Sequence, residues 1–96
     1  MRGNGPLTNG VENAEDVMAR VGRRIGELRE AAGLTQAQVA DELDMTVSNY
    51  QRIEHGLQNL SIKTMVRVAA VLGVPTAKLF TATSTRRRGR GRPKKK

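Results

Sequence analysis

Three glycines divide the middle of this chain into short amphipathic stretches: Gly33, Gly56 and Gly73 each follow one of them. Glycine is frequent directly after a helix, because the residue there often takes a positive φ. A residue suited to cap a helix N-terminus precedes each stretch. The candidate caps are Asn13, Thr35, Thr46 and Ser61. The chain is therefore predicted to fold into short helices separated by tight turns.

Apolar side chains recur in these stretches mostly at intervals of three or four residues, as on one face of a helix. The four sets are Val17, Val21, Ile25, Leu28 and Ala32; Val39, Ala40 and Leu43; Val47, Tyr50 and Ile53; and Ile62, Met65, Ala69 and Leu72. Asp16 sits at the third helical position after Asn13, and Gln38 completes a capping box with Thr35. Pro75 starts a last short turn, TAKLF, and no segment alternates with period two for long. The sequence predicts an all-α fold.

The 96 residues suggest one domain with an aliphatic core, because the chain holds no Trp, one Tyr and one Phe. A Gly/Asn-rich start and a basic end flank the amphipathic part. We expect residues 1–12 to form a flexible N-terminal arm and residues 13–80 to form the domain. Residues 81–96 are expected to be a polar linker followed by a basic tail without fixed structure in the absence of a partner.

Composition argues against several classes of function. Without cysteine there is no disulfide framework or thiolate metal site. The only histidine, His55, has no Ser, Lys or acidic group beside it in a catalytic motif, so the chain is not expected to be an enzyme or to use a metal or cofactor. No run is apolar enough for a signal peptide or a membrane span. We predict a cytoplasmic, nucleoid-associated protein with no membrane partner and no evident small-molecule ligand.

The connection at Asp44-Met45-Thr46 joins two short helices by a turn of about three residues, which describes a helix-turn-helix unit. The segment 21–80 resembles the phage repressor/Cro-type helix-turn-helix family. The matching motifs are I-x-x-L-R at 25–29, GLTQ at 33–36, VA at 39–40, I-E-x-G at 53–56, S-I-x-T-M at 61–65, A-x-x-LGV at 69–74 and LF at 79–80. The resemblance implies five helices, double-stranded DNA as partner, and a third helix that lies in the major groove.

Two positions depart from the family pattern. The family has Gly in the turn where this chain has Asp44. Aspartate tolerates a left-handed conformation better than most residues do, so we expect the turn to be kept. The family favours Pro where Leu60 stands, which affects one loop and no functional residue.

The resemblance assigns residues of about 46–55 to a recognition helix whose N-terminal part meets base edges. With Tyr50 and Ile53 in the core, the opposite side exposes the predicted base contacts, Val47, Ser48, Gln51 and Arg52. A valine suits a thymine methyl group, serine either base edge, and arginine guanine. In the alternative reading Val47 only covers the helix start and Arg52 pairs with a carboxylate.

Other polar residues suit the DNA backbone. Gln36 starts the second helix, whose unpaired N–H groups suit a phosphate. The predicted backbone contacts are Gln36, Thr46, Asn49, His55 and Asn59. Thr46 and Asn49 are equally suited to be a plain cap and a solvated polar residue. The resemblance pairs Arg29 with Glu54 across the edge of the core, and we assign this ion pair to structure.

The last eleven residues, RRRGRGRPKKK, hold eight of the seventeen basic side chains, whereas the rest of the chain holds nine basic and nine acidic groups. Within the tail, Arg90-Gly91-Arg92-Pro93 resembles the AT-hook, which enters the minor groove of A·T-rich DNA. Narrow A-tract grooves attract inserted arginine. The alternative is an unstructured polybasic tail that binds any polyanion.

We therefore predict a sequence-specific DNA-binding transcriptional regulator that binds a palindromic site as a homodimer, with its tail in the minor groove or on phosphates. Apolar residues beyond the core stripe mark a candidate dimer interface: Val66, Ala70, Val71, Leu79 and Phe80. Alternatively, Phe80 closes the core. The competing function is a transcription adaptor, bridging or architectural nucleic-acid-binding protein without a defined motif.

Overall fold

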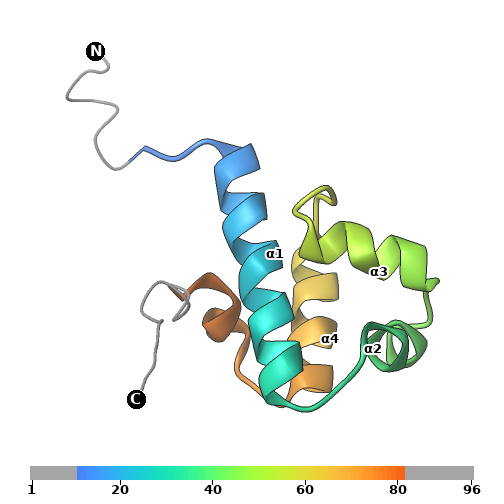
Figure 1. The fold of residues 1–96 in the computed structure, drawn as a ribbon. Helices are drawn as coiled ribbons and strands as arrows, with labels where there is room; N and C mark the ends of the chain where they lie inside the picture. Colours follow the sequence, from blue (N-terminus) through green and yellow to red (C-terminus); the bar gives the residue numbers. More distant parts are fainter. Residues whose placement is uncertain (1–10, 82–96) are drawn as a thin grey trace, which may run out of the picture.

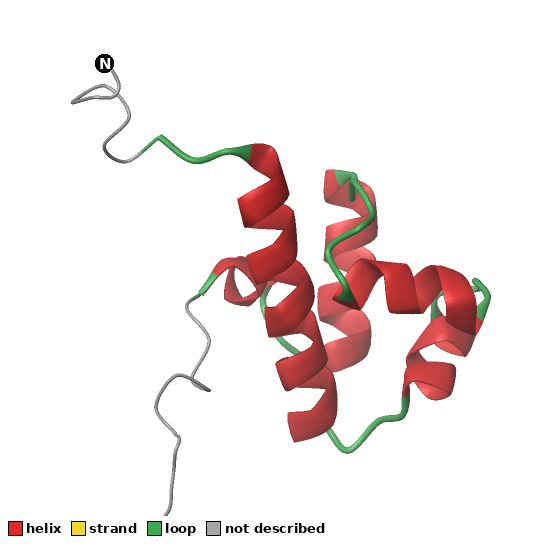
Figure 2. Cartoon of the chain, turned by 45° about the horizontal axis from the view of Figure 1, so that its top comes forward, coloured by secondary structure: helices red, strands yellow, loops and turns green. Residues whose placement is uncertain are grey.

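A computed structural model describes residues 11–81 of the chain. This part contains helices, turns and loops only. Its elements are α1 (Ala14–Ala31), α2 (Gln36–Glu42), α3 (Val47–Glu54), α4 (Ile62–Leu72) and the 3₁₀ helix η2 (Thr76–Phe80). Helices α1 and α4 run side by side, and the α2–α3 pair packs on one side of them (Figures 1 and 2). The predicted all-α fold is confirmed.

All four predicted capping residues begin their helices. Each cap has extended backbone dihedrals and accepts a hydrogen bond on its side-chain oxygen from the backbone N–H three residues later. At α2 the bond is reciprocal, because the Thr35 N–H also donates to the Gln38 side chain at 2.8 Å. Replacing such a cap by alanine typically costs about 1 kcal/mol. These local bonds fix where each helix begins.

The predicted helix stops are confirmed as well. Gly33, Gly56 and Gly73 all take positive φ, between 74° and 75°. Asp44 in the turn between α2 and α3 has a φ of 58°, the left-handed conformation expected of it. Asp44 thus takes the backbone conformation that glycine would supply in this turn, and the connection between α2 and α3 stays short, as in a helix-turn-helix unit.

The core lies between α1, α4 and the α2–α3 pair, and it is aliphatic apart from Tyr50. Its residues are Val21, Ile25, Val39, Ala40, Leu43, Tyr50, Ile53, Met65, Val68, Ala69, Leu72 and Leu79. Truncating a fully buried leucine such as Leu43 to alanine typically costs about 2–5 kcal/mol, so the core is what holds α3 in place.

Three details of the prediction are wrong. The fifth element is a 3₁₀ helix rather than an α-helix, which makes four α-helices in the described part. On α4, Ile62 is 70% exposed whereas Val68 is fully buried. Helical Cα–Cβ bonds tilt toward the N-terminus, so the side chain of this first residue points past the helix end instead of into the core.

The third error concerns Leu79, which we expected in a dimer interface and which is fully buried. Helix η2 packs against both α1 and α4. Successive residues of a 3₁₀ helix point about 120° apart. Leu79 therefore enters the core while Phe80 stays half exposed.

Candidate nucleic-acid interface

Helix α3 presents one buried face and one exposed face. Tyr50 and Ile53 are buried. The four residues predicted to contact bases, Val47, Ser48, Gln51 and Arg52, are all exposed. Val47 is 40% exposed and is not among the residues of the core. The exposed side chains of α3 thus combine apolar, hydroxyl, amide and guanidinium groups. Helix α2 lies beside α3 (Figure 1).

The residues predicted to contact the DNA backbone lie at both ends of this surface. Thr46 caps the start of α3 and its hydroxyl accepts from the Asn49 N–H at 3.0 Å. Gln36 begins α2 and is partly buried against α3. His55 follows the end of α3, and Asn59 lies in the loop before α4, both exposed.

Arg52 lies back against the loop that follows α3. Its Nε donates to the Gln58 side chain and its Nη2 to the Leu57 carbonyl, each at 3.3 Å. Both contacts are long, exposed and to uncharged groups. Within residues 11–81 Arg52 forms no ion pair, in contrast to the alternative in which it pairs with a carboxylate. Its guanidinium charge is therefore not neutralised by a carboxylate of this part of the chain.

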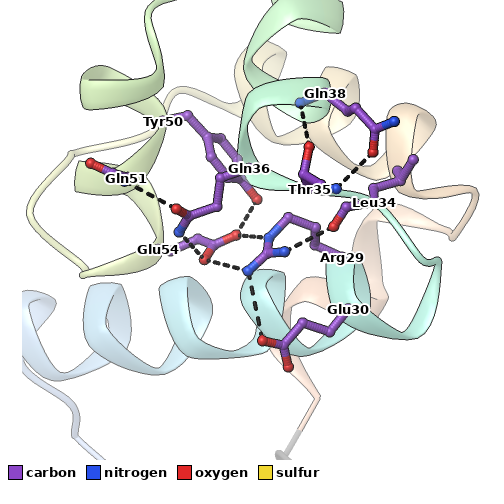
Figure 3. Close-up of polar contacts among 9 residues, drawn as sticks. All are labelled: Arg29, Glu30, Leu34, Thr35, Gln36, Gln38, Tyr50, Gln51 and Glu54. Carbon is purple, nitrogen blue, oxygen red and sulfur yellow. Dashed lines mark hydrogen bonds and ion pairs between the residues drawn. The ribbon is translucent and has the colours of Figure 1, made fainter.

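A polar cluster centred on Glu54 joins α1, α2 and α3 (Figure 3). The Arg29 Nε donates to Glu54 Oε2 at 2.6 Å, and Arg29 Nη2 donates to Oε1 at 3.3 Å. The Tyr50 hydroxyl donates to Oε2 and the Gln36 Nε2 to Oε1 at 3.0 Å. Arg29 also donates to the Leu34 carbonyl at 2.8 Å. The structure brings the expected pair together and adds two donors that the sequence did not indicate.

This cluster is well shielded from solvent, since the side chains of Arg29 and Glu54 are 13% and 9% exposed. Burial by itself would raise the pKa of the Glu54 carboxyl, but hydrogen bonds from Arg29, Tyr50 and Gln36 outweigh it and hold that pKa below its ordinary value. The bond to Glu54 raises the pKa of Arg29. Burial, followed by the bond to Glu54, raises the pKa of Tyr50. Glu54 is thus a charged acceptor at neutral pH.

A helix-turn-helix family model matches residues 25–79, more than half of the chain. The chain belongs to the helix-turn-helix family. A Mycoplasma protein, the control protein C.MunI, is 31% identical over 67 residues, which cover 69% of this chain and 90% of C.MunI. The HTH-type transcriptional regulator RamB of Mycobacterium tuberculosis is 32% identical over 66 residues, which cover 69% of this chain and 14% of RamB.

A solved structure shares the fold. The restriction-modification controller protein C.AhdI from Aeromonas hydrophila superposes with a TM-score of 0.62 at 30% identity, covering 66% of this chain and 96% of C.AhdI. In the present chain the helix-turn-helix unit consists of α2, the turn at Asp44 and α3. Helix α1 contacts this unit through the hydrogen bond from Arg29 to Glu54 of α3.

The packing of α1 against the end of α3 depends on two glycines that the sequence pattern did not indicate, one facing backbone atoms and one facing the Glu54 side chain. A methyl group on Gly22 would lie 2.5 Å from the backbone oxygen of Ile53. One on Gly26 would lie 3.2 Å from the Glu54 Oε1, so this glycine leaves room for the carboxylate. The sequence does contain a sign of this packing, because the two glycines are four residues apart inside a predicted helix. Glycine there destabilises the helix by about 1 kcal/mol relative to alanine, so its presence indicates that a larger side chain would not fit.

Arg67 of α4 makes a hydrogen bond to the C-terminal end of α2. The Arg67 Nη2 of α4 donates to the carbonyl of Leu43, the residue that ends α2, at 2.9 Å. The unit is therefore tied to α1 at the start of α2 and to α4 at its end.

The remaining expectations concern parts outside the described residues. The proposed minor-groove residues Arg90, Gly91, Arg92 and Pro93, the rest of the tail and most of the N-terminal arm lie there. Among residues 11–81, no helix is both long and apolar enough to cross a membrane.

Proposed function

We propose that this protein regulates transcription by placing α3 in the major groove of a specific DNA site. Its membership of the helix-turn-helix family and its likeness to transcriptional regulators make it a sequence-specific DNA-binding regulator. The single observation that carries the geometric proposal is the exposed face of α3, with Val47, Ser48 and Arg52 outside and Tyr50 and Ile53 buried behind.

Each exposed side chain suits a different base edge. Val47 contacts a thymine methyl group, Ser48 bonds either kind of base edge, and Arg52 donates two hydrogen bonds to guanine. Leaving the Leu57 carbonyl costs Arg52 little, because its contacts in the protein are long and exposed. Gln51 is the fourth base reader. Phosphate contacts come from Gln36, Thr46, Asn49, His55 and Asn59, and these fix the register of the protein on the duplex.

The test is selection from random duplexes with the parent protein and with Arg52→Ala. We expect a defined motif for the parent, and for the variant a loss of preference at one base pair per half-site, worth about 1–3 kcal/mol. Arg20→Ala is the matched control, since it removes the same charge from an exposed position on α1 and should leave the motif unchanged. Length-dependent binding without any motif would instead support an adaptor or architectural protein.

A homodimer on a palindromic site is part of the proposal. Ile62, Val66 and Ala70, spaced by four, form an exposed apolar strip on α4 along one side of its buried residues. Val66 and Phe80 are 50% and 52% exposed. Such a face fits a two-fold interface between copies, which operator symmetry mirrors. Val66→Asp should yield monomers in sedimentation experiments, whereas Arg23→Asp, at an exposed position on α1 away from this strip, should not. A parent that sediments only as a monomer, with and without DNA, contradicts the dimer.

The tail supplies most of the long-range attraction to DNA in this proposal. Residues 11–81 carry eight basic and nine acidic groups, so the domain alone is close to neutral, whereas residues 86–96 carry eight positive charges. If about five of these meet phosphates, deleting residues 86–96 lowers the slope of log affinity against log salt by about 4 or 5. The double change Gly91→Ala with Pro93→Ala keeps every charge. A selective loss on A·T-rich flanks supports minor-groove insertion, and equal binding to all flanks supports a polyelectrolyte.

A further inference from the structure

An apolar groove lies between the start of α1 and the loop that joins α3 to α4. Its volume is about 570 Å³, which is within the range of pockets that bind small ligands. Most of the side chains that line it are apolar, among them Val17, Met18, Met65 and Phe80, and Glu15 is the one charged residue in the lining. A concave, mostly apolar surface with few polar groups is typical of a binding site.

The N-terminal arm, residues 1–12, enters α1 beside this groove, because Ala14, the first residue of α1, lines it. The start of α1 and the loop between α3 and α4 lie at the same end of the domain (Figures 1 and 2). Asn9-Gly10 is a dipeptide that favours a tight turn, which directs the preceding residues back along α1. The chain from Leu7 to Ala14 spans at most about 25 Å, whereas the groove follows α1 for about 10 Å, from Ala14 to Val21. Leu7 is thus within reach of the whole groove.

The arm has the chemistry that this groove requires. Pro6 and Leu7 are adjacent apolar residues, and a proline restricts the backbone in advance, which lowers the entropy lost on docking. Arg2 is the one charged side chain of residues 1–10, and its charge is opposite in sign to that of Glu15. Residues 82–96 follow η2, which also lines the groove, but they contain no Leu, Ile, Val, Met or aromatic residue. The arm is therefore the better occupant of the two.

A second copy of the chain is the other candidate occupant, and the tether decides against it. A segment joined to its site by a short stretch of chain binds at an effective concentration in the millimolar range. A separate molecule must reach that concentration to compete equally. The apolar strip on α4 formed by Ile62, Val66 and Ala70 does not line the groove, so the homodimer proposed above does not require it.

We propose that Pro6 and Leu7 of the N-terminal arm dock in this groove and hold the loop that joins α3 to α4. Gln58 and Asn59 of this loop line the groove. The Gln58 side chain accepts a hydrogen bond from the Arg52 Nε at 3.3 Å. Docking of the arm therefore restrains the loop against which Arg52 lies. The inference concerns the protein without DNA, so it does not depend on the proposed function.

The experiment uses the full chain with isotope-labelled methionine methyl groups, observed by NMR spectroscopy. Met18 and Met65 line the groove, whereas Met45, in the turn between α2 and α3, does not. Because the chain has no cysteine, Asn4→Cys provides a single site for a nitroxide spin label. We expect the label to abolish the Met18 and Met65 methyl signals and to leave the Met45 signal. Adding Leu7→Asn should restore the two lost signals.

Amide hydrogen exchange tests whether the docked arm holds the loop. Leu7→Asn should speed exchange in residues 57–60 by about fivefold or more, because local opening then no longer requires the arm to leave. Thr8→Asn is the matched control, since it places the same amide at the next residue of the arm and removes no large apolar side chain. It should behave as the parent in both measurements.

A mixture of two preparations distinguishes docking within one molecule from binding to a second copy. One preparation carries the spin label without the isotope, and the other carries the isotope without the spin label. Loss of the Met18 and Met65 signals in this mixture means that the arm binds another molecule, and it overturns intramolecular docking. Signals that persist in the labelled parent, or that stay lost after Leu7→Asn, overturn docking through Leu7. Unchanged exchange in residues 57–60 overturns the restraint on the loop.

Discussion

Replacing Glu54 by glutamine tests whether the buried cluster stabilises the domain. Each carboxylate oxygen of Glu54 accepts two hydrogen bonds, from Arg29 and Tyr50 on one side and from Arg29 and Gln36 on the other. The glutamine amide keeps one acceptor oxygen and sets an NH₂ group against the other two donors. Two bonds to a charged acceptor are lost, at about 1.5 kcal/mol or more each. We expect a loss of about 3 kcal/mol, at the low end of the range for breaking a buried pair.

The measurement is urea denaturation followed by circular dichroism at pH 7. A domain of this size has a margin of roughly 4–10 kcal/mol, so Glu54→Gln should remain folded and melt about 12–24 °C lower than the parent. The matched control is Glu12→Gln. Glu12 pairs with Arg20 at the same 2.6 Å distance as the Glu54 pair, but these side chains are 53% and 49% exposed.

Exposed pairs contribute about 0–1 kcal/mol, so Glu12→Gln should change stability by less than about 0.5 kcal/mol. If the two variants lose the same free energy of unfolding, burial does not strengthen the Glu54 cluster and the reasoning fails.

The other predictions concern the pH dependence, the packing and the turn. The pKa of the Glu54 carboxyl is lowered on folding, so its contribution to stability is complete above about pH 4.5, the ordinary value, and is lost as the pH falls through the lower folded value. In urea titrations from pH 7 to pH 3, the difference in free energy of unfolding between the parent and Glu54→Gln should therefore shrink. A constant difference contradicts this prediction. Gly22→Ala should lower the free energy of unfolding by about 1–3 kcal/mol, despite the better helix propensity of alanine, because its methyl group meets the Ile53 backbone; a raised melting temperature contradicts the close approach. At Asp44, with φ of 58°, Asp44→Gly should be neutral or stabilising and Asp44→Val should cost about 1–2 kcal/mol, and equal urea midpoints for the two variants contradict the backbone argument.

The sequence predicted most of what is local in this protein. Each helix begins at its expected cap because the decisive bond runs from a side chain to a backbone N–H only three residues away. Helix ends followed from glycine at positions of positive φ, and the turn at Asp44 followed from the conformational tolerance of aspartate. The exposed face of α3 was predictable as well, since Tyr50 and Ile53 mark its buried side.

Burial at the margins of the core was not predictable in the same way. Periodicity put Ile62 inside and left Val68 out, whereas the reverse holds, because it does not tell where a neighbouring helix ends. Leu79 and Phe80 are both apolar neighbours at the end of the fold. Only the packing of η2 on α1 and α4 decided that the first is buried and the second half exposed.

The polar cluster shows the same division most clearly. The sequence alone, through family resemblance, indicated that Arg29 and Glu54 pair. It gave no sign that Gln36 bridges Glu54 and Gln51, residues 18 and 15 positions away along the chain. Hydrogen bonds between side chains so far apart in the sequence exist only once α2 has packed against α3. Local chemistry therefore determined the helices and the face that α3 presents, and the tertiary structure decided how the amides on that face are oriented.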